Sequence, residues 1–131
     1  MFIKYAFVAD KASIDTQGKF SALGIFDTIA ALTFPARQRE MTFAAYLEGS
    51  HSEKGKRKLS VELRDEDGNK LLAIDQEIEL NPKSLKAGVL ITFADIIFPK
   101  HGNYEVALFV DGRFLGRVTF SLHKIPAAGA N

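Results

Sequence analysis

The chain of 131 residues contains neither cysteine nor tryptophan and has only three histidines. Without cysteine there are no disulfide bonds and no thiolate metal ligands, a composition typical of proteins from a reducing, cytoplasmic setting. His51, His101 and His123 lie far apart and show none of the short spacings of zinc-binding motifs. We therefore expect no metal site and no cofactor, with the histidines in surface loops and at strand ends.

An excess of charge of either sign is also missing. The 17 basic and 16 acidic residues leave a net charge of +1, which gives no electrostatic reason to expect binding to nucleic acid or to an anionic membrane. The start of the chain does not read as a signal peptide, because Lys4 and Asp10 leave only a short apolar run. No segment approaches the roughly 20 apolar residues of a membrane-spanning helix. We expect a cytoplasmic protein with neither nucleic acid nor membrane as its partner.

Catalytic motifs are missing as well. The segment 49–56 has its glycines one residue too far apart for a phosphate-binding loop, and there is no Gly-x-Ser-x-Gly nucleophile elbow. The acidic segment 65–69 begins like a calcium-binding loop, but Lys70 stands where that loop needs glycine and Gln76 where it needs its closing glutamate. A hairpin turn accounts for the same residues. We predict no catalytic residue, and an enzyme is the less favoured hypothesis.

What the sequence does contain is a series of short segments in which apolar and polar residues alternate with period two, the pattern of half-buried β-strands. About eight such strands predict an all-β fold, namely an antiparallel two-sheet β-sandwich of the immunoglobulin-like kind, with a small closed barrel as the alternative. Gly102, two residues before Tyr104, resembles the start of a tyrosine corner. We assign residues 1–125 to a single domain and residues 126–131 to a flexible C-terminal tail. The predicted strands are 2–9, 19–26, 40–48, 58–64, 72–80, 89–98, 104–110 and 114–122.

The clearest signal is a hairpin over residues 104–122, with Asp111 and Gly112 at its turn. A two-residue loop would bring apolar positions of one strand onto the same face as charged positions of the other. We therefore predict a three-residue loop, 110–112, with Gly112 at positive φ. The predicted pairs are Phe109 with Arg113, Leu108 with Phe114, Tyr104 with Val118, and Glu105 with Arg117, the last of opposite charge.

A second hairpin precedes it in the chain, with Asp67 and Gly68 at its turn. Here the alternation fits a two-residue loop at these two positions. The predicted pairs are Leu63 with Leu72, Val61 with Ile74, and Lys58 with Glu77. The two hairpins are thus predicted to use the same Asp-Gly dipeptide with different loop lengths.

Other segments are less clearly patterned. Strand 2–9 is apolar on both faces, which leaves its buried face open. Gly24 indicates a bulge or a close backbone approach. In the segment 27–38, Pro35 favours an edge strand or a crossover. Strand 89–98 is apolar on both faces, which predicts a central strand.

In the predicted register, one patch on the outward face of the last hairpin is apolar. It consists of Ala107, Phe109 and Leu115, with Glu105 and Arg117 as a charged rim. A cluster on neighbouring strands exceeds the scattered apolar surface of ordinary proteins. It is either an interface for an unknown protein partner or a homodimer, with Phe109 as its anchor, or it is covered by another part of the chain, namely the N-terminal strand, the segment 27–38 or the C-terminal tail.

Five runs of residues resemble a known family. They are YAFVAD, GKFSALGIFDTI, FP, LRDEDGNKLL and FPKHGNYEVALFVDGRFLG. Together they span nearly the whole chain and resemble a family of small uncharacterised bacterial all-β proteins, known only as a domain of unknown function. Because the runs consist of turns and core positions, the resemblance implies the sandwich fold and a bacterial or phage source. It implies no catalytic residues.

From these observations we expect a non-catalytic binding or protein-interaction module, self-association included. Two alternatives stay open. One is a small-ligand-binding protein or enzyme with its site in a cleft of the sandwich, because a site built in space need not leave a sequence motif. The other is a structural subunit of a phage or bacterial assembly.

Overall fold

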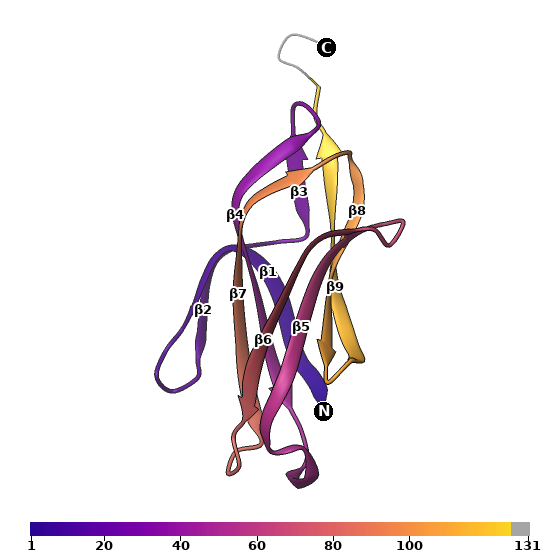
Figure 1. The fold of residues 1–131 in the computed structure, drawn as a ribbon. Helices are drawn as coiled ribbons and strands as arrows, with labels where there is room; N and C mark the ends of the chain where they lie inside the picture. The colour runs from indigo at the N-terminus through magenta and orange to yellow at the C-terminus, as the bar shows by residue number, and fades with distance from the viewer. Residues whose placement is uncertain (127–131) are drawn as a thin grey trace.

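The computed structural model describes residues 1–126, which form nine strands in two sheets that pack face to face (Figure 1). The four-stranded sheet has the order β2-β1-β4-β7, and the five-stranded sheet has the order β3-β9-β8-β5-β6. All paired strands are antiparallel except β3 and β9. The predicted two-sheet sandwich is confirmed, and its immunoglobulin-like character stays a prediction. The bounds are β1 Phe2–Ile14, β2 Phe20–Phe26, β3 Thr28–Ala31, β4 Ala36–Glu48, β5 Gly55–Asp65, β6 Lys70–Leu80, β7 Lys86–Phe98, β8 Gly102–Val110 and β9 Arg113–Lys124.

Helical structure within residues 1–126 amounts to one 3₁₀ turn, η1 (His51–Glu53), between β4 and β5. Nothing in this part of the chain forms a helix long and apolar enough to cross a membrane. The predicted flexible tail, 126–131, falls outside the described residues except for Pro126. Just before it, the N–H of Ile125 donates to the carbonyl oxygen of Ala31 at 2.9 Å, so the chain leaves β9 beside β3.

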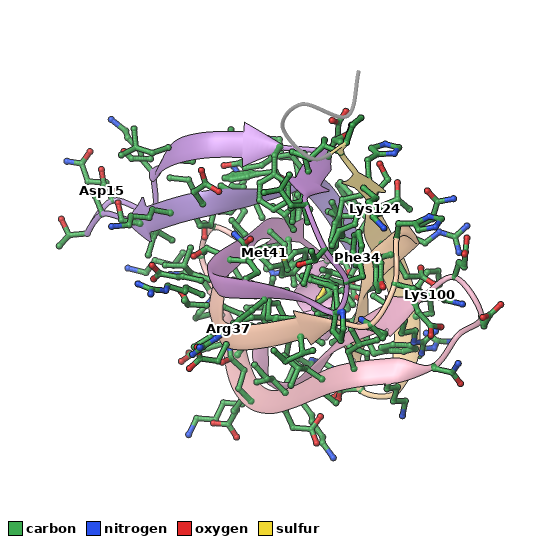
Figure 2. The ribbon with its side chains drawn as sticks, turned by 90° about the horizontal axis from the view of Figure 1, so that it is seen from above. Asp15, Phe34, Arg37, Met41, Lys100 and Lys124 are labelled. Atoms are coloured by element: carbon green, nitrogen blue, oxygen red, sulfur yellow. The ribbon has the colours of Figure 1, made fainter. Side chains whose placement is uncertain are left out.

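The core lies between the sheets and follows from the alternation of side chains along each strand. In β4 the predicted inward set, Met41, Phe43, Ala45 and Leu47, is buried. Figure 2 shows Met41 near the middle of the molecule and Asp15 at its periphery. In the first strand, whose buried face the sequence left open, the residues that pack against the core are Ile3, Ala6 and Val8.

Tyr104 closes one end of this core. Its ring lies 4.9 Å from that of Phe98 and 5.9 Å from that of Phe120, measured between centroids. Its hydroxyl donates a hydrogen bond to the carbonyl oxygen of Lys100 at 2.6 Å. This is the contact that a tyrosine corner makes, and it ties the β7–β8 loop to the core.

The loop between β8 and β9 differs from the prediction. Val110 pairs with Arg113, which leaves Asp111 and Gly112 as a two-residue loop. Their φ angles are 50° and 79°, as a type I′ turn requires. The three-residue loop is therefore wrong, whereas the positive φ of Gly112 is confirmed.

A β-bulge follows this turn. Phe109 lies opposite Phe114, but the register then shifts and Leu108 lies opposite Gly116. The extra residue in β9 is Leu115. The predicted pairs of this hairpin are therefore wrong. The apolar sides of β8 and β9 face the same way because of the bulge in β9, and not because of a three-residue loop.

In the β5–β6 hairpin the predicted strand pairs are right and the predicted loop is wrong. All of its predicted strand pairs are confirmed. The loop, however, is longer than predicted, because the N–H of Asp65 donates to the carbonyl oxygen of Asn69 at 2.9 Å and three residues, 66–68, remain between them. A register shift then makes Leu71 the extra residue of a bulge. The two-residue turn at 67–68 is therefore wrong, although the register is right.

The β1–β2 hairpin extends beyond the sheet and folds onto its outer face. The first part of β1 pairs with β4, and the last part pairs with β2 alone. Phe20 of β2 meets Tyr46 of β4 edge to face, with centroids 6.2 Å apart, and both Ile14 and Phe20 lie against Gly88 of β7. This cover accounts for the apolar outer face of β7, an edge strand, only around Gly88, because Ile97 farther along the same face is 53% exposed. The prediction of a central strand is wrong.

The segment after β2 changes sheets. The carbonyl oxygen of Asp27 accepts the N–H of Ser121 at 2.9 Å, and β3 then pairs in parallel with the end of β9. The chain returns past Pro35 to the four-stranded sheet, where β4 begins. The prediction of an edge strand or a crossover is confirmed, because the segment contains both.

Candidate functional site on the five-stranded sheet

Four of the five residues predicted to form an interaction surface share the outer face of the five-stranded sheet. Glu105 and Arg117 form an ion pair at 3.6 Å. Phe109 is half-buried, and Ala107 is fully buried beneath the side chains of neighbouring strands. Leu115 is the exception, because it packs against the core beside the bulge. The structure thus brings Ala107, Phe109, Glu105 and Arg117 together, but not Leu115.

Phe114 takes the position expected for Leu115. Its ring meets that of Phe109 with centroids 5.6 Å apart and planes inclined at 61°, and 53% of Phe114 is exposed. The guanidinium carbon of Arg64, in β5, lies 5.2 Å from the centroid of Phe109, within cation–π range. We call Arg64, Phe109 and Phe114 the aromatic patch.

Sequence reasoning missed Phe114 because the three-residue loop placed it on the inner face, opposite Leu108. The signal that could have found it is the Asp-Gly dipeptide itself, which most strongly favours a two-residue turn. With that turn, Phe114 lies opposite Phe109 on the outer face, as observed.

Glu62 holds Arg64 in place over Phe109. Its carboxylate, only 12% exposed, accepts a hydrogen bond from Nε of Arg64 at 3.0 Å and pairs with Nζ of Lys70 at 3.2 Å. The bond from Arg64 lowers the pKa of Glu62, against the opposing effect of burial. The carboxylate is therefore ionised at neutral pH and shared by two cations, an arrangement that anchors the patch.

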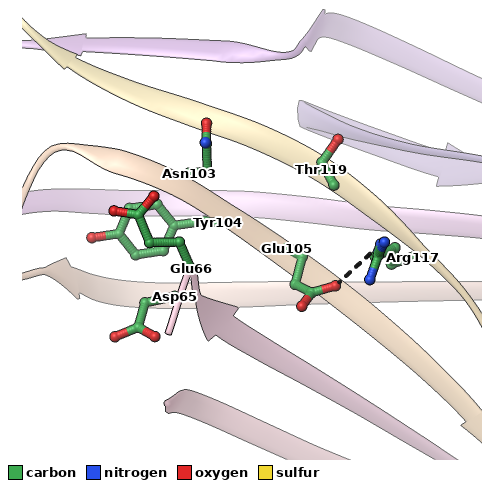
Figure 3. Close-up of a pocket in the computed structure, with 7 residues that line it drawn as sticks. All are labelled: Asp65, Glu66, Asn103, Tyr104, Glu105, Arg117 and Thr119. Carbon is green, nitrogen blue, oxygen red and sulfur yellow. Dashed lines mark ion pairs between the residues drawn. The ribbon is translucent and has the colours of Figure 1, made fainter. Parts of the chain in front are cut away.

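Beside the Glu105–Arg117 pair the same face is hollowed into a pocket of about 150 Å³ (Figure 3). Pockets for small-molecule ligands usually measure roughly 300–1,000 Å³, so this one is small enough to suit a single side chain. Figure 3 shows the ion pair at one end and Tyr104 with Glu66 at the other. The residues around the pocket are Asp65, Glu66, Asn103, Tyr104, Glu105, Arg117 and Thr119.

Asp65, at the edge of this pocket, is engaged within the β5–β6 turn. Its carboxylate accepts the N–H of Asp67 at 3.0 Å, the N–H of Asn69 at 2.8 Å and the side-chain amide of Asn69 at 3.2 Å. Burial raises the pKa of Asp65, but these hydrogen bonds outweigh it and the net shift is downward. Residues 1–126 contain no cluster of three or more His, Asp or Glu side chains that could hold a metal ion. Of the carboxylates that suggested a calcium loop, that of Asp65 accepts the hydrogen bonds of the turn, and that of Asp67 pairs with Nζ of Lys100 at 3.2 Å.

Solved structures resemble this fold at low sequence identity. The alkylpurine DNA glycosylase AlkC of Pseudomonas fluorescens, bound to DNA containing an abasic site analog, matches over 90% of this chain and 30% of its own, with 12% identity and a TM-score of 0.50. A glycosyl hydrolase family 2 member from Bacteroides cellulosilyticus matches over 63% of this chain and 12% of its own, with 18% identity and a TM-score of 0.49. This chain corresponds to less than a third of either protein. At these identities the likeness concerns the fold alone.

No curated protein matches the chain. A family profile, however, matches residues 4–123 and so includes all or nearly all of every strand of both sheets. The matched region includes the two Asp-Gly hairpins and the tyrosine corner, the features on which the resemblance to an uncharacterised all-β family rests. That resemblance is confirmed: the chain belongs to the family of unknown function DUF6941.

Proposed function

We propose that the chain is a non-catalytic protein-binding module whose partner docks on the outer face of the five-stranded sheet, at the aromatic patch. The observation that carries the proposal is the exposed ring of Phe114, which meets the ring of Phe109 edge to face, while the guanidinium of Arg64 lies over Phe109. Aromatic and arginine side chains supply much of the binding energy of protein interfaces. Since Arg64 is held by Glu62, little side-chain freedom is lost when a partner binds.

The surroundings of the patch favour a protein over a small molecule as the ligand. The Glu105–Arg117 pair forms a polar rim, as is usual around the apolar centre of an interface. The adjacent pocket of about 150 Å³ suits one side chain of a partner. A partner that covers Phe114 and inserts a polar side chain into this pocket would use both features.

A cytoplasmic location and a bacterial source belong to the same proposal. The absence of cysteine supports a reducing compartment. The resemblance drawn from the sequence supports the bacterial source.

Affinity capture from a lysate of the source organism tests the proposal with three baits: wild type, Phe114→Ser and Phe2→Ser. Phe2 is the matched control, because it is 52% exposed but lies on the other sheet, in β1. We expect at least one protein that wild type and Phe2→Ser retain and Phe114→Ser loses. Equal retention by all three baits would contradict the proposal.

The choice of Phe114 keeps folding and binding separate. Leu115 packs against the core, so a polar residue there would destabilise the fold itself. Phe114 is more than half exposed, and its replacement should leave the circular dichroism spectrum and the unfolding midpoint nearly unchanged. A loss of binding by folded Phe114→Ser therefore reports on the surface.

A further inference from the structure

The dipeptide Asp-Gly occurs twice in the chain, at 67–68 and at 111–112. Each forms part of a hairpin loop of the five-stranded sheet. An aspartate followed by glycine is a sequence at which a peptide chain readily closes a succinimide ring, because glycine has no Cβ to hinder attack by its backbone nitrogen. The two loops therefore offer the same reaction in different surroundings.

The glycines of the two loops are equally accessible. The φ angles of Gly68 and Gly112 are 85° and 79°, and apart from the chain neighbours no atom lies within 4 Å of a Cβ built at either position. A difference in reactivity between the loops has to come from the aspartate side chains and from the hydrogen bonds that hold the backbone.

Asp111 is tied to β5 by three hydrogen bonds. Its N–H donates to the carbonyl oxygen of Lys58 at 2.8 Å, and its carboxylate accepts the N–H of Lys58 at 3.1 Å and a bond from Nη1 of Arg57 at 3.0 Å. The bonds from Lys58 and Arg57 lower the pKa of the Asp111 carboxyl group. Ring closure starts from the protonated carboxyl group, whose hydroxyl oxygen leaves as water. These bonds therefore keep Asp111 both ionised and fixed in position.

The side chain of Asp67 is held far less firmly. Within residues 1–126 its carboxylate has a single polar contact, the ion pair with Nζ of Lys100 at 3.2 Å. The two side chains are 63% and 51% exposed, and exposed ion pairs contribute little to stability. Figures 1 and 2 show the β5–β6 loop projecting from the body of the molecule. The carboxyl group of Asp67 is therefore free to turn toward the backbone nitrogen of Gly68.

One hydrogen bond opposes the reaction in the β5–β6 loop. The N–H of Gly68 donates to the carbonyl oxygen of Asp65 at 3.1 Å, so the attacking nitrogen is released only when the turn opens. This bond lies beyond the last strand pair of the hairpin, Arg64 with Lys70, and exposed loops open locally at little cost in free energy. Release of Asp111 is harder, because its three bonds to β5 have to break together.

We propose that Asp67 is a site of spontaneous isoaspartate formation and that Asp111 is protected from it. The backbone nitrogen of Gly68 attacks Cγ of Asp67, and its proton leaves with the carboxyl hydroxyl as water, which closes a succinimide ring. A solvent water then adds to one of the two ring carbonyls. Opening at Cγ restores aspartate. Opening at the main-chain carbonyl carbon leaves the peptide bond at Cγ and frees the α-carboxylate, and the product is isoaspartate.

The product changes the loop at the edge of the pocket. Isoaspartate adds one carbon atom to the main chain between Asp65 and Asn69, inside the ring that the N–H of Asp65 closes with the carbonyl oxygen of Asn69. Its carboxylate is attached directly to Cα, which weakens the pair with Lys100. Asp65 and Glu66 of the same loop line the pocket. The shape of this pocket edge is therefore expected to change as the protein ages.

Incubation of the folded protein at neutral pH for several weeks tests the proposal. Trypsin separates the two sites, because cleavage after lysine and arginine releases them in the peptides 65–70 and 101–113. Electron-transfer fragmentation in a mass spectrometer distinguishes isoaspartate from aspartate in each peptide. We expect isoaspartate to accumulate about tenfold faster at position 67 than at 111, because charge-assisted hydrogen bonds have to break first at Asp111. Equal rates, a faster reaction at 111, or no isoaspartate at 67 would overturn the proposal.

The urea-unfolded chain is the control, because both dipeptides are then free of the fold. We expect the two positions to react there at similar rates. A difference that persists in urea would contradict the structural explanation, since it would come from the sequence alone.

Two substitutions test the protection of Asp111 in the folded protein. Arg57→Gln removes one bond from its carboxylate and should raise the rate at 111 severalfold, with the rate at 67 unchanged. Lys100→Gln removes the exposed pair of Asp67 and should change the rate at 67 little. An unchanged rate at 111 in folded Arg57→Gln would contradict the protection. Phe114→Ser should react like wild type at both positions, so this inference and the proposed function are tested separately.

Discussion

Tyr104 and Lys100 are joined across the start of β8 by a hydrogen bond of 2.6 Å from the tyrosine hydroxyl to the lysine carbonyl oxygen. The tyrosine is 2% exposed. Its burial raises the pKa of the hydroxyl, so the group remains a donor well above neutral pH. The bond supports the loop that leads into β8, the strand that carries Phe109.

Tyr104→Phe should lower the free energy of unfolding by about 1 kcal/mol, the usual contribution of one such hydrogen bond. The ring remains, so its packing against Phe98 and Phe120 is kept. Urea denaturation measures the change. Tyr5→Phe is the control, since Tyr5 is 45% exposed, and its change should stay within about 0.5 kcal/mol. Equal effects of the two substitutions would show that the corner bond contributes nothing specific.

Gly112→Val should destabilise the fold by about 1–3 kcal/mol, because a β-branched residue is strained at its φ of 79°. Steric contact adds nothing, since no atom lies within 4 Å of a Cβ built there. Gly112→Asn should cost less, because asparagine tolerates the left-handed region. Denaturant midpoints measure both. A midpoint unchanged by valine would mean that the type I′ turn is not formed.

Calcium should leave the melting temperature unchanged. The carboxylate of Asp65 is engaged by Asp67 and Asn69, and a ligand that binds only the folded state would have to stabilise it. Thermal melts with calcium and with a chelator provide the comparison. A rise of several degrees with calcium, abolished by changing Asp65 and Asp67 to asparagine, would contradict the turn interpretation.

Acid should weaken the fold through Glu53. Its carboxylate pairs with the ammonium group of Met1 at 2.5 Å and accepts the N–H of Ser50, and these bonds lower its pKa to about 2. In the unfolded chain the ordinary value of about 4.3 applies. Because the folded value is the lower one, the stabilisation is present above about pH 5 and is lost as the pH falls toward 2.

Urea midpoints at several pH values measure this loss for wild type and Glu53→Gln. The variant should be less stable near neutral pH and should depend less on pH between about 5 and 2. An identical pH dependence of the two proteins would show that the pair with Met1 does not contribute.

The strands and their inward faces could be predicted because each sheet has one face covered by the other. Met41 and Phe43 of β4 and Leu63 of β5 are buried as the alternation indicates. The same pattern failed for β7, whose outer face is covered by Phe20 of the β1–β2 hairpin near Gly88 and is exposed at Ile97. Apolar residues on both faces of a strand therefore do not show whether it is central, partly covered by a folded-over hairpin, or partly exposed.

The two bulges could not be predicted from alternation. In β5–β6 a three-residue loop and a bulge together give the alternation expected for a two-residue loop, and in β8–β9 a two-residue loop and a bulge give the alternation expected for a three-residue loop. In β6 the extra residue is Leu71, and in β9 it is Leu115. In the candidate site, the position of the extra residue decides which side chain is on the surface. Because the bulge is at Leu115, Phe114 points outward and Leu115 packs against the core.

The parallel pairing of β3 with β9 also constrains how the protein is made. Thr28 lies opposite Ser121, so the partner of an early strand is synthesised only after almost every other strand. On the ribosome, β1 and β2 can form their hairpin at once, but β3 must wait, unpaired, until β9 has emerged. Pairings of such long sequence separation slow folding. Closure of the five-stranded sheet is therefore expected to be a late event in folding, and until it occurs the nascent chain exposes the apolar residues that β3 and β9 later bury.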